Sequence, residues 1–216
     1  MSKPITLKPI RKITIEPLRP AVTVQSPKPE EPAQHVADFL FQQAEKEGCQ
    51  LFGIIDSARN EDVFRHLITG NVRYKSLFEG TMDEQSYGVS GFLVECKKES
   101  LLFQWMTTEV WGESCCIFFT SKSDFDNLFK HFQQFNRVYL EDDQVVLFRY
   151  YDPRVLRVYL PTCSRREIDL FFGEVLSFFA EADTTDIIQE FRKAPKEEAS
   201  KNILVGSGKV FTRKDN

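Results

Sequence analysis

Apolar side chains along the chain follow two spacings, and each spacing predicts a different kind of element. A repeat of three or four residues places apolar side chains on one face of a helix, whereas a short continuous apolar run is typical of a buried strand. Segments with the helical repeat are 36–44, 63–68, 101–106, 125–135 and 168–179. Apolar runs that suit strands are 51–55, 91–96 and 114–120. Helices and strands therefore alternate along the middle of the chain.

Two further β-rich runs, 138–140 and 145–150, flank a short polar stretch, which predicts a β-hairpin. Pro153 then suits the first position of a helix, and Ser164 suits the cap of the next one. Strands that are separated by helices imply parallel pairing, while the hairpin implies an antiparallel edge. We therefore predict an α/β fold, with a single domain over residues 35–182 and a mixed β-sheet flanked by helices.

The two ends of the chain differ from this middle part. Seven of the ten prolines lie in residues 1–34, and proline fixes φ and lacks a backbone N–H, so a Pro-rich extended arm is predicted there. Two interpretations of the arm stay open: a disordered linker, or a segment that docks on its own domain or on a partner by pairing with a sheet edge. Residues 183–216 are more polar, and Ile187, Ile188 and Phe191 predict one short helix before a flexible tail.

Composition and charge exclude several classes of protein. The net charge of −4 is too close to neutral for a nucleic-acid or membrane-surface protein, and no apolar run approaches the roughly 20 residues that cross a bilayer. The five cysteines form no C-x-x-C pair, and residues 1–19 hold no continuous apolar stretch of a secretory signal. We therefore expect a cytoplasmic protein with reduced thiols, no membrane insertion and no nucleic-acid partner. Its 20 phenylalanines can fill a core or cover a protein-binding surface.

A search for catalytic or ligand-binding motifs finds no residues whose spacing lets them act together. The three histidines, His35, His66 and His131, are predicted on helix surfaces among polar neighbours, and no Gly-x-Ser-x-Gly or His-x-x-x-His motif occurs. Residues 206–209 read Gly-Ser-Gly-Lys, but Ile203 stands where a phosphate-binding loop needs glycine. We therefore predict no catalytic residue, no metal site, no cofactor and no small-molecule substrate.

The segment 145–162 is the most distinctive part of the sequence. A predicted strand delivers Arg149 to a turn that holds Asp152, and the following helix begins at Pro153 with Arg154 beside it. Asp152 can cap this helix and attract the guanidinium of Arg149 or Arg154, because arginine and carboxylate groups form paired hydrogen bonds. We therefore predict that Arg149, Asp152 and Pro153 form a structural junction between the strand and the helix.

The same junction would hold aromatic and basic side chains in position for a partner. Tyrosine and arginine are enriched at the energetic centres of protein interfaces. A purely architectural role and direct contact with a partner both stay open for this segment. The predicted partner-binding residues are Trp111, Tyr150, Tyr151, Arg154 and Tyr159.

Several blocks of the sequence, taken in order, resemble a bacterial family called domain of unknown function 4123. The motif Phe-Arg-Tyr-Tyr-Asp-Pro-Arg-Val at 148–155, followed by Leu160-Pro161, is similar to the motif that marks this family. The other similar blocks are Leu51–Ala58, Tyr74–Gly80, Trp111–Ser114 with Ile117–Ser121, and Phe171–Gly173. Together the blocks span about residues 50–180, and the ordered set is far more specific than any one block.

The resemblance implies that the chain is an adaptor, or chaperone, of bacterial type VI secretion. Such proteins bind a toxic effector and load it onto the spike-tip protein VgrG. The resemblance therefore implies two protein partners, the effector and VgrG.

Two other functions stay open on the sequence alone. An immunity or regulatory protein from the same kind of locus would bind and inhibit a toxin. A hydrolase would use Asp56, which ends the first predicted strand, or Glu109, since many α/β enzymes place catalytic groups at strand ends.

Overall fold

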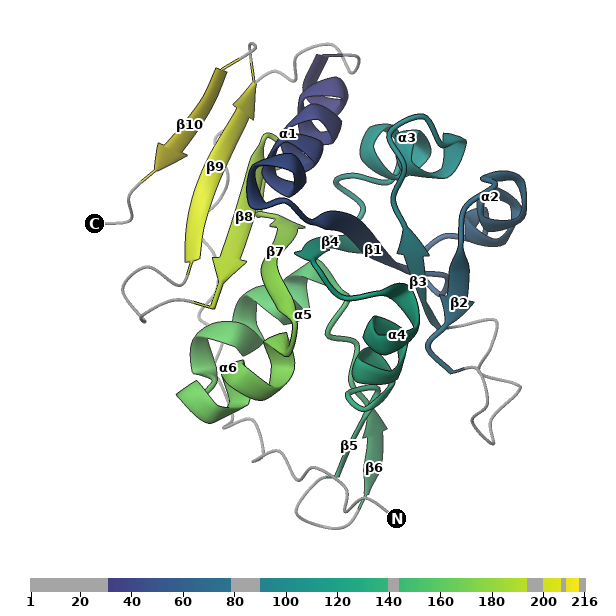
Figure 1. Cartoon of the computed structure of the whole chain (residues 1–216), viewed down its shortest axis with the longest axis vertical. Helices are drawn as coiled ribbons and strands as arrows, with labels where there is room; N and C mark the ends of the chain where they lie inside the picture. Colours follow the sequence, from purple (N-terminus) through teal and green to yellow (C-terminus); the bar gives the residue numbers. More distant parts are fainter. Residues whose placement is uncertain (1–30, 79–89, 140–143, 194–199, 207–208, 214–216) are drawn as a thin grey trace, which may run out of the picture.

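The computed structural model describes residues 31–78, 90–139, 144–193, 200–206 and 209–213 (Figure 1). Its helices are α1 Glu31–Glu47, α2 Val63–Thr69, α3 Leu101–Thr108, α4 Phe125–Gln133, α5 Pro153–Tyr159 and α6 Arg165–Phe172. Its first six strands are β1 Gln50–Asp56, β2 Tyr74–Ser76, β3 Gly91–Glu95, β4 Cys116–Ser121, β5 Arg137–Tyr139 and β6 Val145–Leu147. Its last four strands are β7 Val175–Glu181, β8 Ile187–Arg192, β9 Ser200–Gly206 and β10 Lys209–Arg213.

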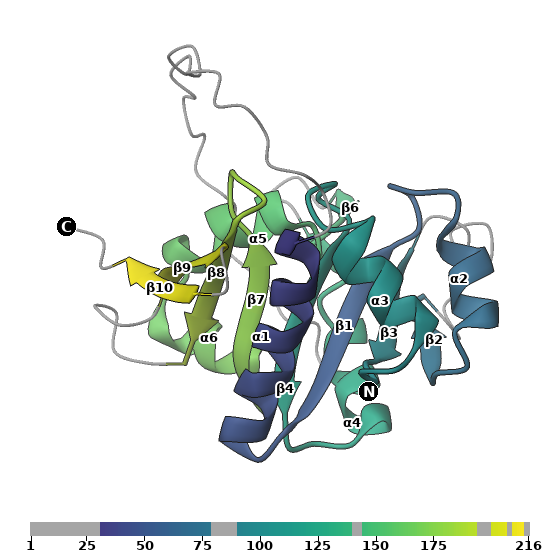
Figure 2. The same cartoon turned by 90° about the horizontal axis from the view of Figure 1, so that it is seen from above.

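One sheet organises the described part of the chain. Its eight strands lie in the order β10-β9-β8-β7-β4-β1-β3-β2, as Figure 2 shows from above, while β5 and β6 form a separate hairpin. The α/β fold with flanking helices and the hairpin are confirmed. The mixed sheet is not, because every pairing among the described strands is antiparallel. Helix α3 does connect two strands of equal direction, β3 and β4, but β1 lies between them and runs opposite to both.

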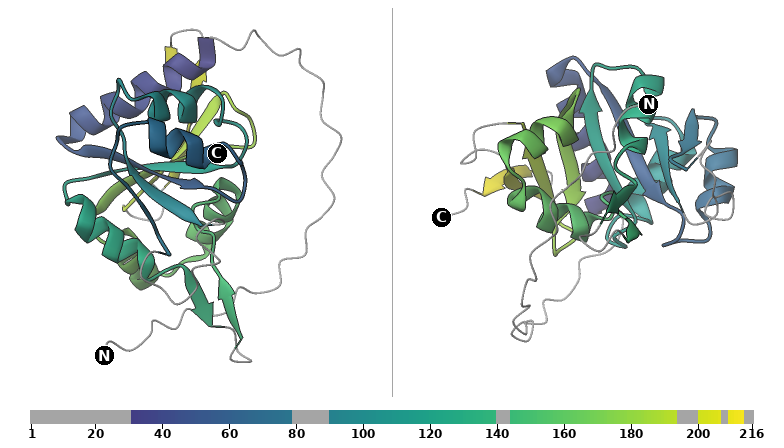
Figure 3. Two further views of the ribbon diagram at one scale, coloured as in Figure 1. Left: turned by 90° about the vertical axis from the view of Figure 1, so that its right-hand side faces the viewer. Right: turned by 90° about the horizontal axis from the view of Figure 1, so that it is seen from below.

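Helices cover both faces of the sheet and make three layers (Figure 3). Alternate residues of a strand point to opposite faces, so β1 sends Leu51 and Ile55 into one core and Phe52 and Ile54 into the other. Helices α1, α2 and α3 cover the first core. Helices α4, α5 and α6 cover the second. Central strands buried on both faces explain the continuous apolar runs in the sequence.

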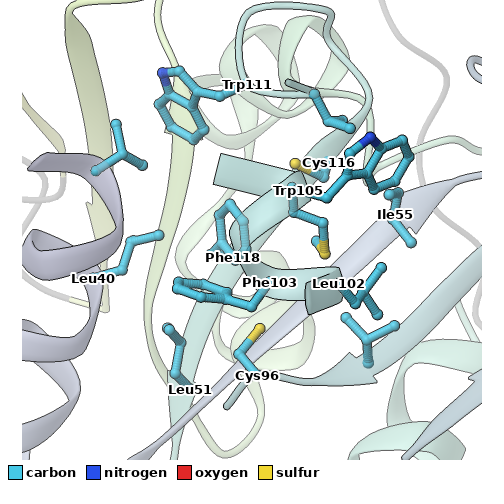
Figure 4. Packing of buried hydrophobic residues seen from close by; sticks show 14 of the residues in the cluster. Leu40, Leu51, Ile55, Cys96, Leu102, Phe103, Trp105, Trp111, Cys116 and Phe118 are labelled. Carbon is cyan, nitrogen blue, oxygen red and sulfur yellow. The ribbon is translucent and has the colours of Figure 1, made fainter. Parts of the chain in front are cut away.

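Helix α3 contributes Leu102, Phe103 and Trp105 to the first core (Figure 4). Phe103 of α3 meets Phe118 of β4 edge to face, with ring centroids 5.7 Å apart. Trp111 stacks on the other side of Phe118, at 6.2 Å between centroids. Ser100 caps α3 by accepting a hydrogen bond from the backbone N–H of Phe103 at 3.1 Å, which fixes where the helix starts.

The second core is an almost continuous set of aromatic rings. Phe132 of α4 packs between Phe119 of β4 and Phe178 of β7, with centroid separations of 4.9 and 6.2 Å. Tyr150 stacks on Phe132 at 5.8 Å and contacts Phe171 of α6 at 5.6 Å. Edge-to-face and offset contacts of this kind stabilise beyond the buried area alone. Many of the phenylalanines therefore serve the interior.

The end of the domain differs from the prediction. The helix that Ser164 caps ends at Phe172, where Gly173 adopts φ +51°, and the apolar residues that follow form β7. Strand β7 is buried on both faces, and such a run cannot be told from a buried helix by its period. The short helix predicted near residue 187 is strand β8, and β9 and β10 follow it within the predicted tail.

The start of the domain also shifts slightly. Helix α1 begins at Glu31, so residues 31–34 belong to this helix and not to the predicted arm. Pro32 lies in its first turn, where the missing N–H has no cost. The rest of the arm, residues 1–30, lies outside the described residues.

A network of charged and hydroxyl groups connects the end of α1 to strands β4, β7 and β8. Arg192 of β8 pairs with Glu47, the last residue of α1, and with the fully buried Glu190 at 2.5 Å. The Oγ1 of Thr120 in β4 donates to Glu47 at 2.7 Å, and Arg192 donates to the Oγ of Ser177 in β7 at 3.0 Å. The network therefore joins α1 to β4 and to the consecutive strands β7 and β8, which are far from α1 in sequence.

We predict that Arg192→Met lowers the free energy of unfolding by about 2 kcal/mol, because it removes the ion pair that Arg192 makes with the buried Glu190. The adjacent variant Lys193→Met is the matched control, since Lys193 makes a single 3.6 Å ion pair with Asp169 at the surface. It should change stability by less than about 0.5 kcal/mol. Urea unfolding of both variants measures the difference, and equal effects would contradict the assigned role of Arg192.

Candidate partner-binding site

The turn between β6 and α5 is held by Asp152, as the sequence predicted. Asp152 is the cap of α5, and its Oδ1 accepts a hydrogen bond from the backbone N–H of Arg154 at 2.9 Å. Pro153 occupies the first helical position, where its fixed φ suits the helix. The structural junction of Asp152 and Pro153 is therefore present in the geometry.

Asp152 also holds the side chain of Arg154 in a two-point contact. The Nε of Arg154 donates to Oδ1 at 3.0 Å and its Nη2 donates to Oδ2 at 2.6 Å. Desolvation opposes ionisation of Asp152, but the hydrogen bonds from Arg154 outweigh it and hold the pKa of Asp152 below its ordinary value. The carboxylate is 6% exposed and the Arg154 side chain is 52% exposed, so the charge that faces solvent is positive.

Arg149, the third predicted member of the junction, takes a different carboxylate. Its Nη1 lies 3.4 Å from Oδ2 of Asp56 at the end of β1, and Asp56 is fully buried. The Oδ1 of Asp56 accepts from the backbone N–H of Ala58 at 2.9 Å. Burial raises the pKa of Asp56, and Arg149 offsets only part of that rise. Arg149 therefore ties the segment after β6 to the central strand.

Three of the five predicted partner-binding residues lie inside the domain. Tyr150 is fully buried and its hydroxyl donates to the carbonyl of Phe132 at 3.0 Å. The ring of Tyr151 lies so close to Gly91 that a Cβ there would stand 2.7 Å from it. Trp111 is buried, and its indole N–H donates to the carbonyl of Thr185 at 2.8 Å. Tyr150 and Tyr151 belong to the second core, which α5 covers, whereas Trp111 belongs to the first core on the other face of the sheet.

The other two predicted residues, Arg154 and Tyr159, both belong to α5 and line one surface there. Tyr159 is half-buried, with its ring 4.7 Å from that of Phe148. Val158, on the same helix, is an apolar side chain that is 52% exposed. The surface is hollowed into a shallow, open depression of about 350 Å³. Its lining residues are Asp152, Arg154, Val155, Val158, Tyr159 and Thr162. We call this surface the α5 depression.

Glu181, which sequence reasoning missed, connects α5 with the loop at residues 112–114. Glu181 at the end of β7 accepts hydrogen bonds from the backbone N–H groups of Gly112 at 2.6 Å and Ser114 at 2.8 Å. Gly112 and Ser114 adopt φ +101° and +54°, so this loop needs glycine at its tightest point. Arg157 of α5 donates to the Glu181 carbonyl at 2.6 Å. The Trp-Gly-Glu-Ser sequence could have indicated the turn but not its partner.

The histidines are not free surface groups. His66 stacks on Trp105 with ring centroids 3.9 Å apart, and the Nε2 of His131 lies 2.9 Å from the carbonyl oxygen of Phe171. Burial lowers the pKa of both imidazoles. His35 falls in α1, among residues whose side chains are not described. His66 and His131 are therefore half-buried at the surface, and their neighbours include aromatic rings where the sequence predicted polar ones.

The cysteines are free thiols. Burial raises the pKa of Cys115 to about 12, so this thiol stays protonated near neutral pH. Within the described ranges, no group of three or more His, Cys, Asp or Glu side chains is placed to hold a metal ion. Among the helices between residues 31 and 193, none combines the length and the apolarity needed to cross a membrane.

Comparison with known proteins gives one match. The model of a family described as "Domain of unknown function (DUF4123)" matches residues 51–170, which include both Asp56 and the α5 depression. No curated protein and no solved structure matches the chain. The match covers more than half of the chain and agrees with the blocks identified in the sequence.

We predict that Asp152→Ala lowers the free energy of unfolding by about 2 kcal/mol, because it removes a helix cap and the two-point contact with Arg154 together. The control is Asp124→Ala, since Asp124 caps α4 through one backbone bond at 2.9 Å but is exposed to solvent. It should cost about 1 kcal/mol. Urea unfolding of Asp152→Ala, Arg154→Ala and the double variant should give a coupling between the two sites, and strict additivity would contradict the contact.

Asp56 gives a prediction for pH dependence. Because its pKa is raised in the folded state, the folded protein holds this proton more tightly than the unfolded chain does, and ionisation lowers stability as pH rises towards the folded-state pKa. Asp56→Asn removes the charge and keeps the shape. The variant should gain stability relative to the parent at about pH 7, and the gain should shrink at about pH 4.

The control for this measurement is Asp126→Asn, for which the opposite sign is expected. Hydrogen bonds from Arg73 lower the pKa of Asp126, so its charge favours the folded state at neutral pH. Urea unfolding at the two pH values tests both variants. A pH-independent effect of Asp56→Asn would contradict the assignment.

Proposed function

This chain belongs to the family described as domain of unknown function DUF4123, and from that premise we propose that it is a cytoplasmic adaptor of bacterial type VI secretion. In this role it binds a toxic effector protein and loads it onto the spike protein VgrG. It acts by binding another polypeptide and catalyses no reaction itself.

The observation that carries this proposal is the α5 depression. It combines an exposed apolar side chain, Val158, with an exposed cation, Arg154, on a helix that is fixed at both ends. Asp152 fixes the start of α5, and Arg157, in the last turn of this helix, donates a hydrogen bond to the backbone carbonyl of Glu181. A rigid surface with an apolar centre and a charged rim is the usual design of a protein-binding site, because little conformational freedom is lost on binding.

The surroundings of Asp56 support a structural role for this residue over catalysis. Its two oxygens are already occupied by the backbone N–H of Ala58 and by Arg149. Glu109, the other carboxylate considered for hydrolysis, is the residue that ends α3 and is exposed. Asp56 thus serves to anchor the segment that leads into α5.

The proposal is tested by deleting the gene and measuring export of the toxin encoded beside it. We predict that secretion of this toxin falls to background while secretion of VgrG continues, because an adaptor is needed for export of its own effector and not for assembly of the secretion apparatus. The full-length chain should also co-purify with the toxin and with VgrG. Unchanged toxin secretion in the deletion strain would contradict the proposal.

One further assay separates an adaptor from an immunity or regulatory protein. The purified toxin is assayed with and without an equimolar amount of the full chain. An adaptor leaves the toxin's activity intact, whereas an inhibitor abolishes it. Loss of activity would favour the immunity function and overturn the adaptor proposal.

A further inference from the structure

The α5 depression also indicates what kind of segment binds there. We infer that it takes a segment of the effector in which a carboxylate side chain stands next to a large apolar side chain, with the carboxylate on Arg154 and the apolar group against Val155 and Val158. This inference rests on the proposed function and specifies the cargo that the site accepts.

The first step of the argument concerns the guanidinium of Arg154. This group carries five N–H donors, arranged so that two different edges can each bind one carboxylate. Asp152 takes the edge formed by Nε and one hydrogen of Nη2. The edge formed by Nη1 and the second hydrogen of Nη2 is left, and Nη1 has no partner among the described residues. Arg154 is therefore held in place while one of its binding edges remains open.

The second step concerns charge. Asp152 is the one carboxylate among the described lining residues, and it is 6% exposed and already bound, so among these residues Arg154 supplies the accessible charge. The other lining side chains that the structure describes, those of Val155, Val158, Tyr159 and Thr162, are uncharged. A partner that leaves this cation unpaired on binding loses its hydration without compensation, which is costly. A carboxylate in the partner avoids that cost and gains a paired hydrogen bond to a guanidinium that is already oriented.

The third step concerns spacing. Arg154 and Val158 are four residues apart on α5, and Val155 and Val158 are three apart, so all three side chains share one face of the helix. Neighbours at these spacings lie about 5–6 Å apart at Cβ. The partner's two groups must match that separation. Side chains one helical turn apart, or two residues apart along an extended strand, do so.

The test uses short random peptides displayed on phage and selected on the full-length chain, with counter-selection on the variant Val158→Asp. We expect the selected peptides to share an aspartate or glutamate within one helical turn of a leucine, isoleucine, methionine or phenylalanine. A selected peptide is then synthesised with a fluorophore, and its affinity is measured by fluorescence anisotropy. Val158→Asp and Arg154→Lys should each weaken binding about tenfold. The aspartate removes the apolar contact, and lysine cannot hold Asp152 and the partner's carboxylate through paired hydrogen bonds as a guanidinium does.

Two matched controls lie on α2, which is on the opposite side of the domain from α5 in Figures 1 and 2. Ile68→Asp places the same charge on another exposed apolar position, and Arg65→Lys changes another exposed arginine that pairs with an aspartate. Both should bind the peptide as the parent does. Thermal unfolding confirms that each variant is folded, and Val158→Asp is the decisive one because Val158 takes no part in the helix cap.

Selected peptides without the acidic and apolar pair, no enrichment at all, or equal binding by Val158→Asp would overturn the inference. The same variants introduced into the secretion assay separate this inference from the proposed function. If toxin secretion needs the chain but tolerates Val158→Asp, the adaptor function stands and the site is elsewhere. If the peptides bind as expected but toxin secretion does not need the chain, the site stands and the adaptor function fails.

Discussion

The structure depends on a sheet whose central strands are covered on both faces. Strands β1 and β4 bury alternate side chains in two separate cores, so neither face can be left to solvent. Burial of apolar area at roughly 25 cal/mol per Å² is the largest favourable contribution to such a fold. Two layers of helices are the consequence, and the position of α5 follows from its place in the second layer.

The second layer also explains why α5 can offer an exposed apolar face without being loose. Leu156 points into the aromatic core, while Arg154 and Val158 lie on the other side of the same helix. The cost of burying the Asp152 carboxylate is offset by its hydrogen bonds from Arg154 and from the N-terminus of the helix. The charge pair therefore sets the geometry of the site, and the tyrosines beneath it supply the packing that keeps it rigid.

Short-range signals in the sequence predicted most elements but not how they meet. The caps of α5 and α6 and the β5–β6 hairpin were readable because each depends on residues a few positions apart. Strand β7 was not, because a strand buried on both faces has the same apolar run as a buried helix. Tyr150 and Tyr151 were predicted at the surface, and only the full fold shows that the aromatic core absorbs them. Glu181 and Glu47 were missed because their partners are distant in sequence.

The folding unit is larger than the part of the chain that matches the family. The match ends at residue 170, yet β7 begins at Val175 and pairs with the central strand β4. Without β7, strand β4 would be an edge strand with apolar side chains on both faces, which is prone to aggregation. Glu47, before the matched region, and Arg192, after it, are joined in one network. Residues on both sides of the match are therefore part of one folding unit, because α1 covers the first core and β7 completes the second core, which supports α5.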